Sequence, residues 1–446
     1  MTIGEEPINA DKVQQLQAAL HAKAKESPDF RFYALYDKVY RLDVLRAAYR
    51  QCRQNDGAPG VDRQTFDEVE EYGLERWLGE LAEEFRTKTY RPQAVRRVWI
   101  PKPDGKQRPL GIPTIKDRVA QTALLLILEP IFEADLQPEQ YAYRADRSAL
   151  DAVSAVHRWA SYGHTEVVDA DLSGYFDTIP HAELMQSLAR RISDKAVLHL
   201  LKMWLEAPVE ETDERGHVQR TTVNKDTGRG SPQGSPISPL LANLYMRRFV
   251  AGWKTLGHEQ ALQAKIVNYA DDFVILCRGT ADKAMQVMRS MMAKLKLTVN
   301  EKKTRLCRLP EETFDFLGYT IGPFWSRTRR KMVLGTRPSL KSVQKVKAKI
   351  SELTGRNQTL LEETEVVKRL NRVLQGWGNY FSRGPVSTAY RIIDLHVRQL
   401  FRKWLVAKHK QTGRGINLYP DAYLFEELGL LRLTSLRKEQ LRGRNA

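Results

Sequence analysis

Residues 266–276 of the sequence read IVNYADDFVIL. Two short runs rich in β-branched and aromatic residues flank Asp271 and Asp272, which predicts two strands joined by a tight turn. Adjacent carboxylates at such a turn repel each other, and a bound divalent cation would remove that cost. The alternative is that Asp271 and Asp272 are there only because aspartate favours turns.

A third carboxylate stands at the end of another predicted strand. Residues 165–175 read TEVVDADLSGY, a strand pattern that runs into a turn after Asp171. If neighbouring strands bring Asp171 beside Asp271 and Asp272, the three could hold two Mg²⁺ ions about 4 Å apart. Such a pair of ions suits in-line phosphoryl transfer, because one activates the attacking hydroxyl and the other stabilises the leaving group.

The remaining elements follow from hydrophobic periodicity and turn residues. They are a polar lead-in with one helical pattern at 1–30, helices over 32–88 with a turn at 56–60, strands at 95–101 and 107–112, a buried helix over 116–134, a loop over 228–239 opening a helix over 240–249, and helices from 339 onward. The sequence therefore predicts a helical front, a mixed α/β middle and a helical back.

The net charge of +17 is concentrated at one end of the chain. Residues 327–446 carry 26 basic and 9 acidic residues, whereas the first 326 residues carry 45 of each. A basic surface that served only solubility would spread this charge evenly. The distribution therefore indicates a C-terminal part that binds a polyanion.

Composition excludes several other classes of protein. The three cysteines, Cys52, Cys277 and Cys307, are too widely spaced for a disulfide framework or a zinc cluster. No run approaches the roughly 20 apolar residues that cross a bilayer. The first residues are acidic and lack the apolar segment of a secretion signal. We expect an intracellular, soluble protein with no membrane partner.

Three ordered motifs resemble those of a reverse transcriptase. They read DLSGYFD at 171–177, SPQGSPISPLLAN at 231–243 and YADD at 269–272. More narrowly, the chain resembles the reverse transcriptase/maturase proteins that bacterial group II introns encode, over nearly everything from residue 32 to about residue 410. The resemblance implies a right-hand polymerase of the α/β (α+β) class, with a helical N-terminal extension and a helical thumb or maturase domain.

The patterns and the resemblance together predict five regions. These are a polar lead-in at 1–30, an N-terminal extension at 31–88, the reverse transcriptase fingers and palm at 89–326, a thumb or maturase domain at 327–412, and a basic C-terminal tail at 413–446. The stretch GAPGVD at 57–62 resembles a part of the extension that clamps template and primer, although it is also a plain turn between helices. Residues 411–446 contain no Cys or His, so the resemblance is to members without a zinc-bearing endonuclease.

The resemblance also assigns roles to individual residues. Asp171, Asp271 and Asp272 match the carboxylates that hold the catalytic metals, and Leu172 belongs to both the metal and the nucleotide-binding sets. Phe176 matches the aromatic residue under the sugar of the incoming nucleotide, where a flat ring would collide with a 2′-OH. The alternative for Phe176 is a core aromatic.

Other residues match positions that bind the incoming deoxynucleotide. Lys102 and Arg108, on the two sides of a predicted hairpin, match residues that grip the triphosphate, which suits a bidentate guanidinium. Alone, the hairpin could equally be a solvated basic loop. Gln233 matches the glutamine beside the nucleotide, where Gly234 lets the backbone approach closely. Residues 141–148, YAYRADRS, depart from the usual family pattern.

The basic C-terminal region supplies the predicted nucleic-acid contacts. Lys341, Lys345 and Lys349 are spaced to share one helix face, and Arg398 and Arg402 share another. A basic helix face is usually only a solvated face. The concentrated charge favours contact with RNA phosphates.

The implied activity is RNA-directed DNA synthesis with dNTPs on an RNA template–DNA primer duplex. The implied second role is binding of the parent group II intron RNA to assist splicing, with mobility by target-primed reverse transcription into target DNA. Two alternatives remain: a splicing-only maturase, and a reverse transcriptase recruited to host defence or repair. The expected location is the bacterial cytoplasm, at the nucleoid when bound to DNA, and the oligomeric state is open.

Overall fold

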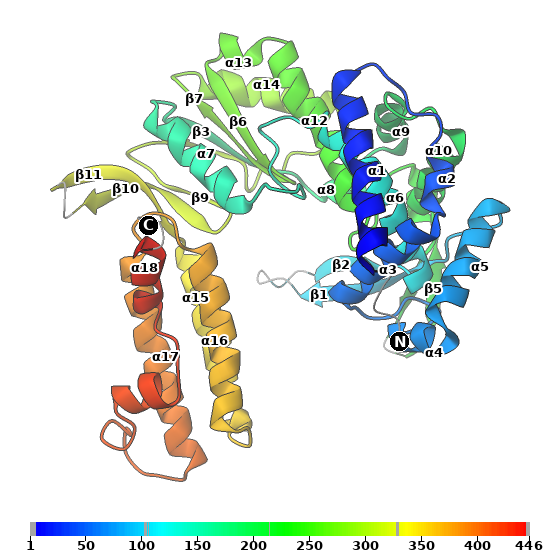
Figure 1. Ribbon diagram of the computed structural model, residues 1–446. Coiled ribbons are helices and arrows are strands. Elements are labelled where there is room, and N and C mark those ends of the chain that lie inside the picture. The colour runs from blue at the N-terminus through cyan, green and yellow to red at the C-terminus, as the bar shows by residue number, and fades with distance from the viewer. Residues whose placement is uncertain (1–5, 102–104, 106, 214, 327–329, 443–446) are drawn as a thin grey trace.

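The computed structural model describes residues 6–101, 105, 107–213, 215–326 and 330–442 (Figure 1). Helices and strands are interspersed from residue 95 to residue 338, five helices precede them, and only helical elements follow. Figure 1 shows the N-terminal helices and a small sheet on one side of a central sheet, with the C-terminal helices on the other side. This order confirms the predicted class, an α/β hand with a helical thumb.

The N-terminal part consists of five helices. They are α1 (Glu6–Glu26), α2 (Tyr36–Val39), α3 (Leu42–Asn55), α4 (Phe66–Tyr72) and α5 (Leu74–Arg86). The expected lead-in packs more closely than predicted, because Val13, Leu20 and Ala24 form one apolar stripe that is buried where α1 meets α6 (Ile115–Glu133). The helix α1 therefore belongs to the main core.

The fingers sheet begins with the predicted hairpin. The strands β1 (Val95–Pro101) and β2 (Gln107–Ile112) pair antiparallel, and β4 (Val209–Thr212) and β5 (Val218–Thr221) extend the sheet in the order β2-β1-β4-β5. The predicted buried helix follows as α6, whose first turn is capped by the Thr114 hydroxyl accepting a hydrogen bond from the Asp117 amide.

The palm sheet is a four-stranded antiparallel sheet of order β6-β7-β3-β8. Its strands are β3 (Glu166–Asp171), β6 (Ala264–Tyr269), β7 (Asp272–Cys277) and β8 (Arg305–Arg308). Side chains alternate between two cores along β3, because Val168 packs in the cluster that contains Met288 and Val167 packs in the cluster that contains Val156. Because apolar side chains cover both faces of the sheet, the polar residues Asp171 and Asp272 are confined to the strand ends.

Helices cover both faces of the palm sheet and connect its strands. They are α7 (Ala149–Ser161), α8 (Tyr175–Thr178), α9 (His181–Ala189), α10 (Lys195–Leu205), α11 (Val223–Thr227), α12 (Ser238–Thr255), α13 (His258–Ala261) and α14 (Ala281–Lys294). The helix predicted over 240–249 is α12, which begins two residues earlier and runs one and a half turns further.

A three-stranded sheet joins the palm to the thumb. Its strands are β9 (Phe314–Phe316), β10 (Tyr319–Ser326) and β11 (Lys331–Pro338). Tyr319 on β10 packs against Phe381 of the thumb with ring centroids 5.0 Å apart. The predicted boundary between residues 326 and 327 thus falls between two strands that pair along eight residues each.

The thumb is a bundle of long helices. Its elements are α15 (Leu340–Leu353), a 3₁₀ turn (Arg356–Gln358), α16 (Glu363–Tyr380), α17 (Ser387–Lys408), a π turn (Tyr423–Glu427) and α18 (Leu433–Arg442). Part of the expected basic tail packs against the thumb helices, since Leu424, Leu430 and Leu433 are buried in the thumb core. In the part of the chain that the structure describes, no helix is both long and apolar enough to cross a membrane.

Candidate active site

The turn between β6 and β7 presents two carboxylates at the edge of the palm sheet. Tyr269 pairs with Asp272, so Ala270 and Asp271 form a two-residue hairpin turn. Ala270 has φ +56°, a left-handed conformation that such turns require but that disfavours residues other than glycine. The buried Asn268 side chain holds this turn, because its Nδ2 donates to the Ala270 carbonyl at 2.8 Å.

Replacing Asn268 by alanine is expected to loosen the turn and destabilise the protein. The buried Ala270 carbonyl would lose its donor, which costs about 1–3 kcal/mol. Urea unfolding should show this loss, and primer extension should fall with it because Asp271 and Asp272 would be less firmly held. Asn55→Ala at the exposed C-terminal end of α3 is the control and should change stability by less than about 0.5 kcal/mol. Equal stability of the two variants would contradict the role given to Asn268.

The palm sheet brings the three predicted carboxylates together. Asp171, the last residue of β3, lies directly across from Asp272, the first residue of β7. Burial and the neighbouring Asp271 and Asp171 raise the pKa of Asp272 to about 7. The pKa of Asp271 is also raised, by burial and then by Asp171. The cluster therefore carries a repulsion that a cation would relieve.

Two residues that the sequence interpretation missed contact Asp171. Asn300 Nδ2 donates to its carboxylate at 2.8 Å, and Lys303 Nζ lies 3.2 Å from the same oxygen. Both residues precede β8, the strand beside β3, and lie three positions apart. A lysine and an amide shortly before β8 were the available signal, but nothing local indicates that they face Asp171.

Leu172, the residue after Asp171, has a buried side chain. It forms an antiparallel bridge with Val299 in which the hydrogen bonds run between the residues on either side. In such a pair the amide and carbonyl of the bridged residues point away from the partner. The Leu172 carbonyl therefore points away from Val299, toward the side of β3 on which β7 lies.

The three aspartates and the Leu172 carbonyl offer oxygen ligands of the kind that a hard divalent cation takes. Carboxylate and carbonyl oxygens are the ligands that Mg²⁺ prefers. Among the residues that the structure describes, no three His, Cys, Asp or Glu side chains are arranged around a single point as ligands. The Asp171 carboxylate is instead engaged by Asn300 and Lys303, which places a positive charge where a cation would relieve the repulsion.

A second group of residues links the fingers to this site. Arg108 Nε on β2 donates to Gln233 Oε1 at 2.8 Å, and the Arg108 charge acts to lower the pKa of Asp271. The Gly111 amide donates to the Gln233 carbonyl at 2.6 Å. A Cβ on Gly234, where φ is +110°, would lie 2.5 Å from the Gly111 carbonyl oxygen. The close approach predicted at Gly234 is therefore made to the fingers strand.

Phe176 and Tyr143 lie beside this group. Phe176 is only 7 % exposed, and its carbonyl accepts a hydrogen bond from the Ser231 amide in the loop that carries Gln233. Tyr143, half exposed with φ +53°, lies close enough to Asp271 and Arg108 for both charges to act on the pKa of its hydroxyl, which burial raises. The sequence marked its loop as unusual but did not single out Tyr143. The predicted Lys102 lies outside the described residues.

The predicted thumb contacts fall into two groups. Lys341, Lys345 and Lys349 are all exposed on α15. Arg398 and Arg402 both contact Asp421, at 2.8 and 2.7 Å, and Arg402 is buried with its Nε bonded to the Tyr419 carbonyl. These ion pairs stabilise the thumb itself, so Arg402 has a structural use that the sequence did not reveal.

Comparison with known protein families identifies two regions of the chain. Residues 100–321 match the family described as Reverse transcriptase (RNA-dependent DNA polymerase), and residues 343–419 match the Group II intron, maturase-specific domain. These ranges contain the palm carboxylates and most of the thumb, respectively.

Individual relatives agree with this assignment. Protein YkfC of Escherichia coli (strain K12) is 31% identical over 367 residues, which is 74% of this chain and 93% of that protein. The Group II intron-encoded protein LtrA of Lactococcus lactis subsp. cremoris is 27% identical over 67% of this chain, which spans 58% of LtrA. Nuclear intron maturase 2, mitochondrial, of Arabidopsis thaliana is 33% identical over 25% of this chain and 15% of its own length. The chain belongs to the reverse transcriptases, RNA-directed DNA polymerases, of the kind that group II introns encode.

Proposed function

We propose that the protein extends a DNA primer on an RNA template by two-Mg²⁺ nucleotidyl transfer at Asp171, Asp271 and Asp272. The observation that supports this most directly is the convergence of three carboxylates at adjoining strand ends of the palm sheet. Such a cluster is unfavourable without cations, and its all-oxygen chemistry suits Mg²⁺.

Asp171, Asp271, Asp272 and the carbonyl of Leu172 would hold the cations. When bound, the cations supply activation of the primer 3′-OH and stabilisation of the pyrophosphate leaving group. Asp171 would exchange its contact with Lys303 for the cation, and the displaced ammonium would stay near enough to offset the negative charge of the nucleotide.

The surrounding residues would bind and select the dNTP. Arg108 carries a guanidinium suited to triphosphate oxygens and already lies within reach of Asp271 electrostatically. Gln233 would lie beside the nucleotide and Phe176 beneath its sugar, with Lys102 as a second contact to the triphosphate. Tyr143 would be a further contact to the nucleotide, on the side of Asp271.

Primer extension tests the proposed chemistry. With pure protein, an RNA template and a DNA primer, dNTP addition is expected in Mg²⁺ and is expected to stop when EDTA removes the cations. The initial rate should rise more steeply than first order in free Mg²⁺ if two ions act together. Folded protein that binds intron RNA but extends no primer in any divalent cation would support the splicing-only maturase instead.

The same chain is proposed to hold the group II intron RNA while the RNA folds and splices. The basic thumb is the supporting observation, because the whole excess charge lies beyond residue 326 and Lys341, Lys345 and Lys349 present it on α15. RNA binding of this kind releases counterions, so the affinity falls as salt rises.

Reversing Lys341, Lys345 and Lys349 to glutamate is expected to weaken intron RNA binding and flatten its salt dependence. Each phosphate contact that is lost should reduce the slope of log affinity against log salt by about 0.7 to 0.9. Filter binding over a salt series measures this slope.

The control for this triple variant is charge reversal of exposed lysines outside the thumb. Lys12, Lys25 and Lys283 are exposed on α1 and α14. Their reversal to glutamate changes the net charge equally and is expected to leave the slope nearly unchanged. Equal slopes for the two triple variants would remove α15 from the proposed RNA surface.

Mobility by target-primed reverse transcription is the third part of the proposal. A complex of the protein with its intron RNA should copy that RNA from a 3′-OH in the target DNA, with the cytoplasm and the DNA-bound nucleoid as the location. The assay supplies the complex with DNA nicked at the insertion site and sequences the junctions. Products that never join intron cDNA to the DNA 3′-end would favour a reverse transcriptase recruited to host defence or repair.

A further inference from the structure

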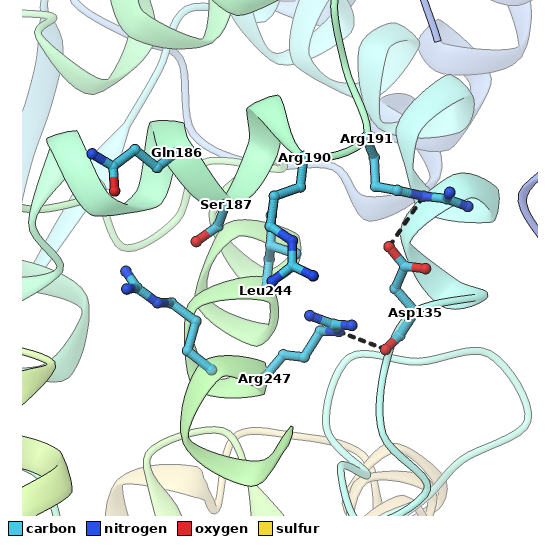
Figure 2. Close-up of a pocket in the computed structure, with 8 residues that line it drawn as sticks. Asp135, Gln186, Ser187, Arg190, Arg191, Leu244 and Arg247 are labelled. Atoms are coloured by element: carbon cyan, nitrogen blue, oxygen red, sulfur yellow. Dashed lines mark hydrogen bonds and ion pairs between the residues drawn. The ribbon is translucent and has the colours of Figure 1, made fainter. Parts of the chain in front are cut away.

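Four arginines surround one cavity between the end of α9 and the helix α12. The cavity measures about 220 Å³. Arg190 and Arg191 follow the end of α9, and Arg247 and Arg248 lie on α12. The other lining residues are Asp135, Gln186, Ser187 and Leu244 (Figure 2). Among the described residues that line it, Asp135 alone is acidic.

Arg191 has a structural use that accounts for its charge. Its side chain is 4 % exposed, its terminal nitrogens donate to carbonyl groups between residues 24 and 30, and its Nε lies 3.2 Å from the Asp135 carboxylate. Arg191 therefore fixes the end of α1 against α9. Asp135 neutralises Arg191 and does not compensate the other three arginines.

The guanidinium groups of the other three arginines have N–H donors that no described residue accepts a hydrogen bond from. Arg190 is exposed, and its side chain makes no hydrogen bond or ion pair with the residues that the structure describes. Arg247 Nε donates to the Asp135 carbonyl at 2.6 Å, which leaves its terminal nitrogens without a partner among the described residues. Figure 2 shows the guanidinium groups of Arg190 and Arg247 pointing toward each other. The Arg248 guanidinium lies over the Tyr245 ring, 5.4 Å from its centroid, and donates one long hydrogen bond, of 3.4 Å, to the Glu183 carbonyl.

The charges around the cavity do not balance. Burial lowers the pKa of Arg247, and the charges of Arg190 and Arg191 lower it further although Asp135 opposes them. The ends of α6 and α9 contribute roughly half a negative charge each, which with Asp135 still leaves about two positive charges uncompensated. The nearby Glu183 carboxylate is paired with Lys296 and so does not supply the balance.

A phosphate group would supply the negative charge that the cavity lacks. Guanidinium groups bind phosphate oxygens in pairs, and the cavity is several times the roughly 30 Å³ that one water occupies, so a phosphate with bound water fits. Arg247 lies nine residues beyond Ser238, the start of α12 near Gln233, or about 13 Å along the helix axis. A nucleic acid held here is therefore outside the site proposed for synthesis.

We infer that this cavity, the arginine pocket of Arg190, Arg247 and Arg248, binds a backbone phosphate of the group II intron RNA. The inference rests on the proposed function for the identity of the RNA. It adds a second anchoring point, on the palm and fingers, to the contacts proposed for the thumb. An acidic side chain of a protein partner would share the charge but would leave RNA binding independent of the pocket.

The test uses the full-length protein and two nucleic acids. One is a transcript of the intron that encloses the gene, and the other is a short RNA template–DNA primer duplex. Arg190→Glu is expected to weaken transcript binding about tenfold or more and to reduce the salt slope by about one, whereas Arg190→Ala should weaken it less. Lys283→Glu on α14 makes the same charge change and should bind as wild type. Extension of the short duplex should be unchanged in all three variants.

Chemical protection gives a measurement that needs no variant. Phenylglyoxal modification of Arg190, measured by mass spectrometry, should fall when the transcript is bound and should not fall with the short duplex. Normal duplex extension together with unchanged transcript affinity and unprotected Arg190 would overturn the pocket while leaving the polymerase proposal intact. Loss of duplex extension in Arg190→Glu would also overturn it, because the residue would then act through the structure. A wild-type protein that extends primers but fails to bind the transcript would refute the proposed intron function.

Discussion

Replacing Asp271 by asparagine is expected to reduce dNTP addition by at least about 10³-fold. The substitution removes one negative charge from the cluster that would hold the cations, and such contacts contribute several kcal/mol to the transition state. Intron RNA binding should stay within about twofold of wild type, because the thumb and its basic face are untouched. Single-nucleotide incorporation and filter binding, performed on the same preparation, measure the two quantities.

The fold of this variant is expected to be intact or slightly more stable. The negative charge of Asp271 raises the pKa of Asp272 in the cation-free protein, so removing that charge relieves the repulsion between the two carboxylates. Thermal unfolding in EDTA should therefore show an equal or higher midpoint for Asp271→Asn. Asp282→Asn, an exposed carboxylate on α14, serves as the control and should incorporate dNTPs at the wild-type rate. A matching loss of RNA binding in Asp271→Asn would show that the turn is needed only for structure.

Replacing Phe176 by valine is expected to admit ribonucleotides. Phe176 is buried, its carbonyl is bonded to the loop that carries Gln233, and a smaller side chain would leave space for the 2′-OH that the ring would exclude. The ratio of kcat/KM for dNTP over rNTP should fall by about 100-fold, mostly through faster rNTP use. Steady-state incorporation of a matched dNTP and rNTP measures this ratio.

A core aromatic provides the matched comparison for Phe176. Phe249 on α12 is fully buried in the same main core, and Phe249→Val removes the same atoms. Both variants are expected to lose stability, because large-to-small core substitutions leave a cavity. Only Phe176→Val should change sugar discrimination. If neither variant changes the dNTP/rNTP ratio, Phe176 is a core residue and the gate proposal is wrong.

The hairpin of the palm can be predicted from the sequence because the residues that define it are close together in the chain. Alternating apolar residues interrupted by Asp271 and Asp272 define two strands and their turn, and the structure adds only the φ of Ala270 and the Asn268 hydrogen bond. The pairing of Asp171 with Asp272 required the further step of placing β3 beside β7. That step came from the resemblance, since nothing in either strand alone specifies its partner.

The contacts that the sequence did not predict are those between distant segments. Lys303 and Asn300 reach Asp171 only because the chain after α14 returns alongside β3. Arg402 had the spacing of an RNA-facing residue, but burial beside Asp421 cannot be seen from its own helix. The same holds for the arginine pocket, whose members come from α9 and α12 and from the end of α6. Composition locates the excess charge in the thumb and gives no sign of this second basic site.

The contact between Gly111 and the loop at Gln233 has a consequence for how the enzyme closes. One hydrogen bond from the Gly111 amide fixes the Gln233 carbonyl to the fingers strand, and the missing side chain of Gly234 lets the two backbones touch. These two contacts tie the position of this loop to that of the fingers strand. On the proposed function, a nucleotide that displaced Arg108 toward its phosphates would act on Gln233 through the hydrogen bond between these two side chains, so the triphosphate contact and the placement of Gln233 would form together.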